Sequence, residues 1–454
     1  MKINVYIPKA ENGEFSRIKL GTHFGDGQES FVKLNIDYRN LYDFTEQSSG
    51  KLFDLFFVSS IVYGVDVLIP REKYSIDGWS RELEVDLPVE DPDLWISLKS
   101  DFEQLLNFLT GDVWNITFIK RPDLQIYVPK AHRRIIKSKP DTFQKVSLFS
   151  GGLDSLVGVI DQLSRSSDKI VFASHYDAIA KGPFSDQNKV SKKLEQAYSK
   201  RFHLIQTRVD LDNVTSNGDK INHENSFRSR SFLFISIALC IANKISQNTS
   251  VLIPENGTIA LNHPLTPSRR SSCSTRTAHP YYISLLNKII SNLGLTNRLI
   301  NDYEFMTKGE MLLQCGDKQT LISAFKESCS CAKRGSRKDI RDIREGTNHC
   351  GVCMPCLYRR ASLHKIGLDD EIYGTNLFQP QTKALLDIQD MPAFLDYLKQ
   401  PLTLEDIERN LLVNGTLPLG KLKEYAMVVV RTRAELKTWI NDKGDNNIKR
   451  LAGI

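Results

Sequence analysis

The stretch "KVSLFSGGLDSLVGVIDQL", Lys145–Leu163, passes from an apolar segment through several small residues into an amphipathic segment. Its first five residues have the composition of a buried β-strand, and its later apolar residues recur at the spacing of one helix face. The two glycines between these segments allow a sharp turn that presents several backbone N–H groups to one anion. Because the positive end of the helix macrodipole faces the same turn, the stretch predicts a strand, a phosphate-binding loop and a helix.

The loop "SGGLDS", residues 150–155, also carries polar side chains. Ser150 and Ser155 supply hydroxyl donors, whereas the carboxylate of Asp154 repels a phosphate. We therefore expect Asp154 either to bind a Mg²⁺ ion that lies between it and the phosphate or to cap the helix. The loop is not a Walker loop, because no Gly-Lys-Ser/Thr follows it. Ser150, Asp154 and Ser155 are the predicted catalytic residues.

Strand-like and helix-like segments alternate after this loop. The strand candidates are "KVSLF", "KIVFAS", "FHLIQTRVDL" and "SVLIPEN". This alternation predicts an α/β domain over residues 141–367, with a parallel sheet covered on both faces and ligands at the carboxyl ends of its strands. Residues 1–140 read as a separate, strand-rich N-terminal α+β domain, and residues 368–454 as a helical C-terminal extension.

The composition limits the class of protein. Of the 454 residues, 41% are hydrophobic, enough for a sizeable core, and 60 Lys+Arg against 54 Asp+Glu give a net charge of +6. This charge fits anionic substrates but is too small to indicate nucleic-acid binding, which stays open. The first residues lack the apolar core of a signal peptide, and the longest apolar run, residues 232–242, is too short to span a bilayer. We expect a cytoplasmic protein that does not enter the membrane.

Five of the eight cysteines lie between Cys329 and Cys356. Cys350, Cys353 and Cys356 repeat at every third residue, so that their thiolates can converge on one metal ion. A fourth ligand from Cys329 or Cys331 would complete a closed, tetrahedral zinc site of the structural kind. An iron–sulfur cluster is the alternative, because three thiolates at such spacings also bind iron.

Two motifs together resemble a known enzyme family. "SGGLDS" after a strand resembles the pyrophosphate loop of the N-type ATP pyrophosphatases, whose PP-loop domain is a Rossmann-like adenine nucleotide α-hydrolase fold. With the later "CGVCMPCLYRR", it resembles the QueC-like family of 7-cyano-7-deazaguanine synthases. The resemblance covers about residues 144–367 and implies Cys329, within Ser-Cys-Ser, as the fourth zinc ligand beside Cys350, Cys353 and Cys356. The overall layout is similar to that of the QueC-like component of the Qat anti-phage defence system, since ordinary family members lack both terminal extensions.

The resemblance implies ATP, Mg²⁺ and Zn²⁺ as cofactors and a 7-carboxy-7-deazaguanine-type carboxylate as substrate. The carboxylate would be activated as an acyl-adenylate, with release of pyrophosphate, and passed to an amine. In the family that amine is ammonia, and the amide is then dehydrated to a nitrile. The predicted ATP-binding residues are Ser150, Gly151, Gly152, Leu153, Asp154, Ser155, Arg228 and Arg230. The two arginines are included because they open a long helix and their guanidinium groups suit phosphate or carboxylate.

Further residues are candidates for the substrate pocket. Glu255–Gly257 end a predicted strand on the ligand-binding side of the sheet. Arg276, Thr277 and His279 follow, and His279 is either a general base or a structural histidine.

The terminal extensions and the loop leave three readings of the function open. One hypothesis is that the extensions dock a macromolecular acceptor, so that the activated deazaguanine is joined to a protein amine of a partner in a defence complex. A rival enzyme is an ATP-dependent tRNA thiolase with an iron–sulfur cluster. A rival of another class is a non-catalytic scaffold that uses the loop to sense nucleotides.

Overall fold

The computed structural model describes most of the chain. The described residues are 1–8, 18–23, 29–45, 49–124, 139–179, 181–266, 276–332, 347–375 and 390–454. Within them, no helix combines the length and apolar character needed to cross a bilayer.

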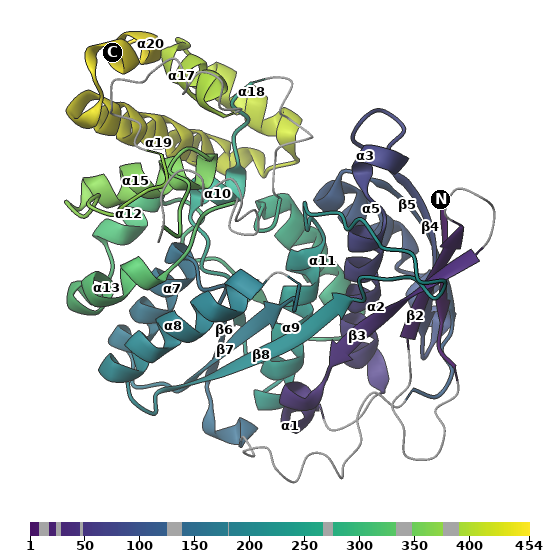
Figure 1. Cartoon of the computed structure of the whole chain (residues 1–454). Helices are drawn as coiled ribbons and strands as arrows, with labels where there is room; N and C mark the ends of the chain where they lie inside the picture. The colour runs from purple at the N-terminus through teal and green to yellow at the C-terminus, as the bar shows by residue number, and fades with distance from the viewer. Residues whose placement is uncertain are drawn as a thin grey trace.

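One ten-stranded sheet runs through the described part of the chain (Figure 1). Its strands are β1 (Lys2–Tyr6), β2 (Ile18–His23), β3 (Glu29–Asp37), β4 (Glu82–Val89), β5 (Val113–Lys120), β6 (Lys145–Leu148), β7 (Ile170–Tyr176), β8 (Phe202–Leu211), β9 (Val251–Leu252) and β10 (Leu299–Ile300). Their order is β10-β9-β6-β7-β8-β3-β2-β1-β4-β5. The pairs from β10 to β8 and from β1 to β5 are parallel, and the pairs from β8 to β1 are antiparallel. The predicted α/β architecture with a largely parallel sheet is confirmed.

The order of β6 to β10 contains one reversal. From β6 the chain adds β7 and β8 on one side, and it then crosses to add β9 and β10 on the other. The reversal therefore lies between β6 and β9, which pair in parallel with each other. Open α/β sheets bind their ligands beside such a reversal, at the carboxyl ends of the strands.

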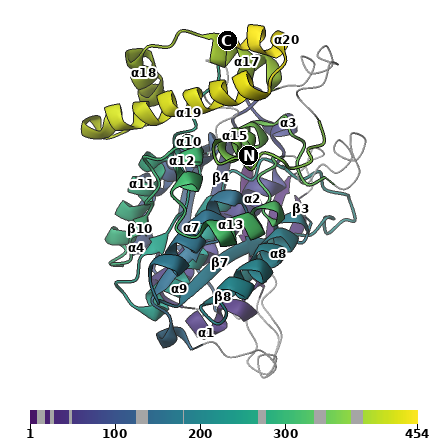
Figure 2. The same cartoon turned by 90° about the vertical axis from the view of Figure 1, so that its left-hand side faces the viewer.

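The parallel strands are buried on both faces. In β7, Val171 and Ala173 pack into one apolar core, whereas Ile170 and Phe172 pack into another. Alternate side chains of a strand point to opposite faces, so the continuous apolar run of β7 reflects two covered faces. Helices α2 (Gly50–Leu68) and α9 (Arg230–Ile245) cover the first face. Helices α7 (Leu153–Arg165), α8 (Lys181–Ala197) and α13 (Lys318–Ala324) cover the second, in front of the sheet in Figure 2.

The remaining helices connect and flank these layers. They are η1 (Arg39–Leu41), α1 (Tyr42–Thr45), α3 (Arg71–Tyr74), α4 (Pro92–Ile96), α5 (Lys99–Thr110), η2 (Pro140–Thr142), α10 (Gly257–Leu261), α11 (Pro280–Asn292), α12 (Lys308–Leu313), η4 (Phe325–Glu327) and α15 (Met354–Lys365). The last described segment is helical, as predicted, with α17 (Met391–Lys399), α18 (Leu404–Asn414), η5 (Leu419–Lys421), α19 (Leu422–Lys443) and α20 (Asn446–Ala452). Helix α19 lies across α10, α12 and α15, drawn in yellow above them in Figures 1 and 2.

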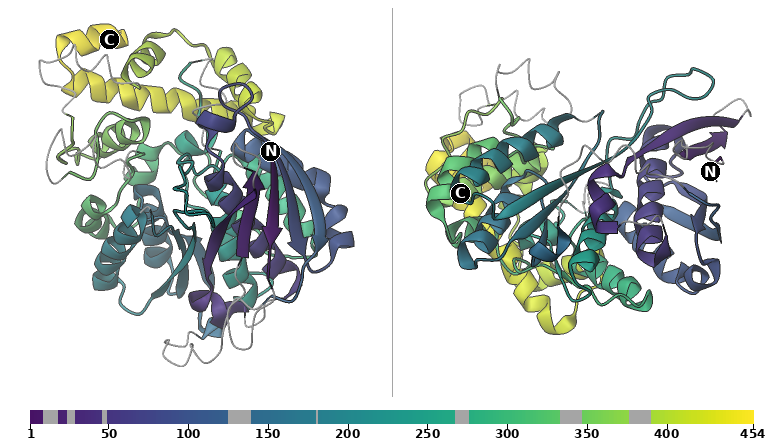
Figure 3. Two further views of the ribbon diagram at one scale, coloured as in Figure 1. Left: turned by 45° about the vertical axis from the view of Figure 1, so that its right-hand side comes forward. Right: turned by 90° about the horizontal axis from the view of Figure 1, so that it is seen from below.

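The N-terminal segment does not form a sheet of its own. Strand β3 pairs with β8 from Leu34↔Leu211 to Asp37↔Arg208, so the strands of residues 1–120 continue the sheet of the α/β domain (Figure 3). Helices α2 and α5 also share one apolar core with α9. Among the described residues, the sheet and this apolar core both continue across the domain boundary expected at residue 140.

A close contact sets the distance between α7 and the end of β9. A Cβ atom on Gly158 of α7 would lie 2.1 Å from the Cβ of Pro254, which follows β9. Glycine is required here because any side chain would push the helix away from the strand.

Gly158→Ala is expected to lower the free energy of unfolding by about 1–3 kcal/mol, because the added methyl group overlaps Pro254. Ser164→Ala, on the exposed side of the same helix, is expected to change it by less than about 0.5 kcal/mol. Urea unfolding of both variants measures the difference. Equal stability of the two would mean that this contact does not fix the helix.

Candidate functional site

The loop of residues 150–155 leaves the carboxyl end of β6 and enters α7, as the sequence predicts. Gly151 has φ +81°, a left-handed conformation that favours glycine. A Cβ there would also lie 2.8 Å from the backbone nitrogen of Gln187 on α8. The loop is therefore pressed against α8, and only glycine fits this position without strain.

Hydrogen bonds within the loop fix its two serines. The Ser150 hydroxyl accepts from the Gly152 amide at 3.2 Å and donates to Ser155 Oγ at 3.2 Å. Ser155 Oγ in turn donates to the Gly152 carbonyl at 3.0 Å. Gly152 is the N-cap of α7, and no side chain of the described residues caps this helix. First-turn amides without a side-chain cap can bind an anion.

Asp154 does not cap α7, so the structure does not support a capping role for this residue. Its carboxylate instead accepts a hydrogen bond from Lys308 Nζ at 2.5 Å, and both side chains are largely buried. Lys308 is the first residue of α12. Sequence patterns do not predict this lysine, because it lies far along the chain from the loop and in no recognised motif.

Glu255, just after β9, is the third ionisable group beside the loop, after Asp154 and Lys308. Burial and the hydrogen-bonded Asp154 carboxyl group raise the pKa of Glu255 well above its ordinary value, although Lys308 acts in the opposite direction. With Glu255 protonated, the group of Asp154, Glu255 and Lys308 carries no net charge, which limits the cost of burying it. The prediction that Glu255 lies on the ligand-binding side of the sheet agrees with this position.

The raised pKa of Glu255 predicts a pH-dependent stability. Unfolded, Glu255 loses its proton near pH 4.3, whereas in the folded chain it keeps the proton to higher pH. Stability contributed by this group is therefore full below about pH 4.3 and is lost as the pH rises through the folded-state pKa. Glu255→Gln, which cannot ionise, should lose less stability than the wild type between about pH 4.5 and pH 8. Thermal unfolding across this range tests it, and parallel curves for the two proteins would contradict it.

The two predicted arginines lie at the start of α9, Arg228 in the turn before the helix and Arg230 as its first residue. Arg230 begins α9, and its Nε donates to Nδ1 of His175 at 3.2 Å, at the carboxyl end of β7. Burial and Arg230 lower the pKa of His175 to about 3, so this histidine is a neutral acceptor. The guanidinium of Arg228 is buried and lies 4.9 Å from the ring centre of Trp79. Contact of either arginine with phosphate stays a prediction.

His279 has a structural role. Its Nδ1 accepts from the backbone amide of Tyr281, so it caps α11, and its ring packs on Phe108 of α5. Arg276 donates to the carbonyl of Phe108 at 2.7 Å. These contacts fit the structural role of His279 and not that of a general base. Arg276, Thr277 and His279 lie at the junction of α5 and α11 and not beside the loop of residues 150–155.

Four buried thiols form a second site. The Sγ atoms of Cys331, Cys350, Cys353 and Cys356 all lie within 4.8 Å of one another. The backbone amides of Cys350 and Cys353 donate to sulfur, at 3.4 Å in each case. Gly351, at φ +86°, makes the turn that folds the Cys-Gly-x-Cys run around one point. Such a group can bind a metal ion.

The fourth thiol is that of Cys331, and the prediction of Cys329 is corrected in this respect. Sγ of Cys329 instead lies 3.6 Å from the carbonyl oxygen of Asn348. The backbone amide of Cys329 donates to the carbonyl of Gly151 at 3.0 Å, which ties this segment to the loop of residues 150–155. The sequence "SCSC" offers both thiols at almost the same place, so spacing alone does not distinguish them.

No protein-family model matches the sequence, and no curated protein or solved structure matches it.

Cys331→Ser is expected to remove most of the bound metal and to lower the melting temperature by several degrees, because three thiolates no longer close the site. Cys329→Ser is the matched control, with the same change two residues away, and is expected to keep the metal. Elemental analysis of protein purified under reducing conditions gives the metal content. Loss of metal from Cys329→Ser alone would overturn the assignment of Cys331.

Proposed function

We propose that this protein is an ATP-dependent adenylating ligase of the QueC-like family. It would activate a 7-carboxy-7-deazaguanine-type carboxylate and pass it to an amine. The observation that carries the proposal is the glycine loop at the sheet reversal, with uncapped first-turn amides of α7 and with Lys308 beside it. The amides and the Lys308 ammonium, which in this structure pairs with Asp154, offer hydrogen-bond donors for a pyrophosphate group that departs from ATP.

The reaction would proceed in two steps, adenylation of the carboxylate and transfer of the acyl group to the amine. A carboxylate oxygen of the substrate attacks the α-phosphorus of ATP, and the bond between that phosphorus and the bridging oxygen of the β-phosphate breaks. The pyrophosphate keeps the electron pair, and the loop amides with Lys308 offset its growing charge. An amine nitrogen then attacks the acyl carbon, AMP leaves, and the amine loses a proton to give the amide.

Asp154 and Glu255 are the residues that would hold Mg²⁺, because hard carboxylate oxygens suit this ion and both lie beside the loop. The ion would supply positive charge to the phosphates. Glu255 must lose its proton to take part, so this role requires that the ion and nucleotide displace the hydrogen bond between the two carboxyl groups.

The metal at the four thiols is proposed to be zinc. At a Zn–S distance of about 2.3 Å, the sulfur atoms of a tetrahedral site lie about 3.8 Å apart. The recorded separations are 4.0 Å between Cys331 and Cys353 and 3.9 Å between Cys350 and Cys356. This compact arrangement favours one ion over an iron–sulfur cluster, and with it the ligase over a thiolase. A colourless zinc protein is the expected result, and a brown iron protein would favour the thiolase.

The acceptor is either ammonia or an amine of a protein partner, and intact-mass measurement separates them. Incubation with ATP, substrate and a candidate partner should add the deazaguanine acyl mass to that partner if its amine is used. Unmodified partners together with a free amide or nitrile would identify ammonia as the acceptor.

Release of pyrophosphate from ATP and 7-carboxy-7-deazaguanine tests the activity. Lys308→Gln is expected to lower kcat about 100-fold to 1000-fold, by removing a donor from the developing negative charge. Ser150→Ala should also lower it, because its hydroxyl shapes the loop. Lys326→Gln, which breaks an exposed ion pair with Asp370, is the control and should leave kcat unchanged. A wild-type chain that binds ATP but releases no pyrophosphate would favour the nucleotide-sensing scaffold.

A further inference from the structure

Helix α19 of the C-terminal segment contacts the turn that carries Lys308. Thr307, the N-cap of α12, donates its hydroxyl to the Glu435 carboxylate of α19. A Cβ on Gly309 would lie 2.7 Å from Oε2 of the same carboxylate. Glu435 thus touches the residues on both sides of Lys308.

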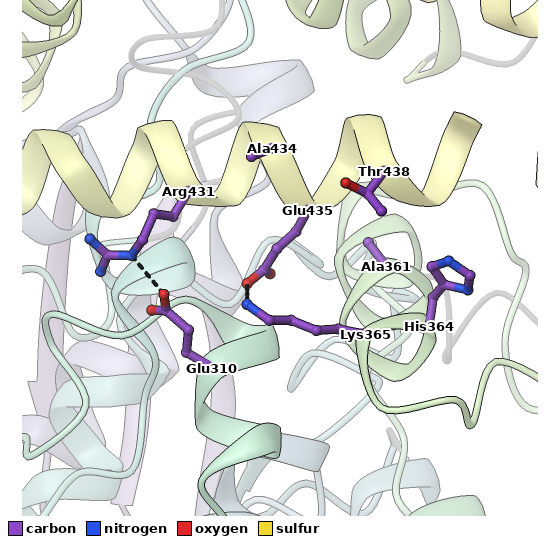
Figure 4. Close-up of a pocket in the computed structure, with 8 residues that line it drawn as sticks. All are labelled: Glu310, Ala361, His364, Lys365, Arg431, Ala434, Glu435 and Thr438. Atoms are coloured by element: carbon purple, nitrogen blue, oxygen red, sulfur yellow. Dashed lines mark hydrogen bonds and ion pairs between the residues drawn. The ribbon is translucent and has the colours of Figure 1, made fainter. Parts of the chain in front are cut away.

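Glu435 is itself held by Lys365 of α15, whose Nζ lies 2.6 Å from Glu435 Oε1. Figure 4 shows Glu435 and Lys365 meeting between the two helices. The Glu435 side chain is 11% exposed and that of Lys365 30%. A carboxylate in this setting is more confined than one in a surface ion pair, so its position is better defined.

A second link from α19 reaches the same turn. Nε of Arg431 donates to Oε1 of Glu310 at 2.7 Å, while the other oxygen of Glu310 accepts from the Thr307 amide at 2.8 Å. Despite partial burial, these donors hold the pKa of Glu310 below its ordinary value. Arg431 also donates to the carbonyl of Phe305, just before the turn, at 2.7 Å.

Apolar packing does not replace these links. A cavity of about 290 Å³ lies where α12, α15 and α19 meet. Its lining residues, drawn in Figure 4, are Glu310, Ala361, His364, Lys365, Arg431, Ala434, Glu435 and Thr438. Met311 and Leu312 pack α12 against α7 and α15 on the side away from this cavity. Beside the cavity, the α12 turn is joined to α19 by the polar links described above.

We infer that Glu435 is a positioning residue that acts through Lys308. By fixing Thr307 and Gly309, Glu435 holds the Lys308 ammonium against Asp154 of the loop. This inference rests on the proposed function, in which the position of Lys308 matters because its ammonium group assists the release of pyrophosphate. It also gives the C-terminal helical segment a part in that reaction.

Glu435→Gln tests the inference, with Asp442→Asn as the matched control. Both changes neutralise an α19 carboxylate that pairs with α15, since Asp442 binds His364 at 2.8 Å, but only Glu435 reaches α12. Glu435→Gln is expected to lower kcat about 10-fold to 100-fold with a much smaller change in KM for ATP, because a displaced lysine fails mainly in the transition state. It should also speed hydrogen exchange at residues 307–313. Asp442→Asn should do neither.

The same assay in Lys308→Gln protein separates positioning from general damage. If Glu435 acts through Lys308, then adding Glu435→Gln to Lys308→Gln lowers kcat no further. An additional 10-fold loss, or a Glu435→Gln protein indistinguishable from Asp442→Asn, overturns the positioning role while leaving the proposed function intact. A wild-type chain that releases no pyrophosphate overturns the proposed function and this role with it.

Discussion

The ion pair between Asp154 and Lys308 joins the two halves of the candidate active site. Asp154 lies in the first turn of α7, where its carboxylate would repel a phosphate bound at the loop, and here a largely buried lysine pairs with it at 2.5 Å. Removing one partner of such a pair typically costs about 3–5 kcal/mol, because the other charge stays buried. Burial, and then the neighbouring Asp154 carboxyl group, raise the pKa of Glu255, since one lysine compensates one carboxylate and not two. The loop, the end of β9 and the start of α12 are therefore mutually dependent.

The thiol site supports the loop from the other side. Cys329 binds the Gly151 carbonyl through its amide, and two residues later Cys331 joins the thiol group. Arg359 of α15 fixes the preceding turn, because it donates to Ser328 Oγ and to the Phe325 carbonyl while paired with Glu371. A bound zinc ion contributes about 10–16 kcal/mol in small zinc domains, so metal binding can order this segment against the loop. The two motifs that stand out in the sequence are thus adjacent parts of one structure.

The sequence predicted those features of the site that depend on residues close together in the chain. The strand, loop and helix of residues 145–163 follow from apolar spacing and two glycines, and the Cys-Gly-x-Cys turn follows from its own spacing. Lys308 was not predictable, because it is one of 60 Lys+Arg and only the fold brings it to Asp154. The continuous sheet was missed for a related reason. Strand β8 has ten residues, and its last four pair with β3. The sequence of a strand does not show whether its edge is exposed to solvent or paired with another strand.

The C-terminal segment shows how a distant element can matter to the loop. The first half of α19 packs with α10 and α18, and its second half packs with the thiol-bearing α15 and with α17 and α20. Thr432, between these halves, shares a hydrogen bond of 2.6 Å with Thr258 of α10, which lies shortly after Glu255. One helix therefore spans the elements that carry Glu255, Lys308 and the thiols. The contacts of α19 with α10, α12 and α15 thus connect the three regions around the loop through a single helix.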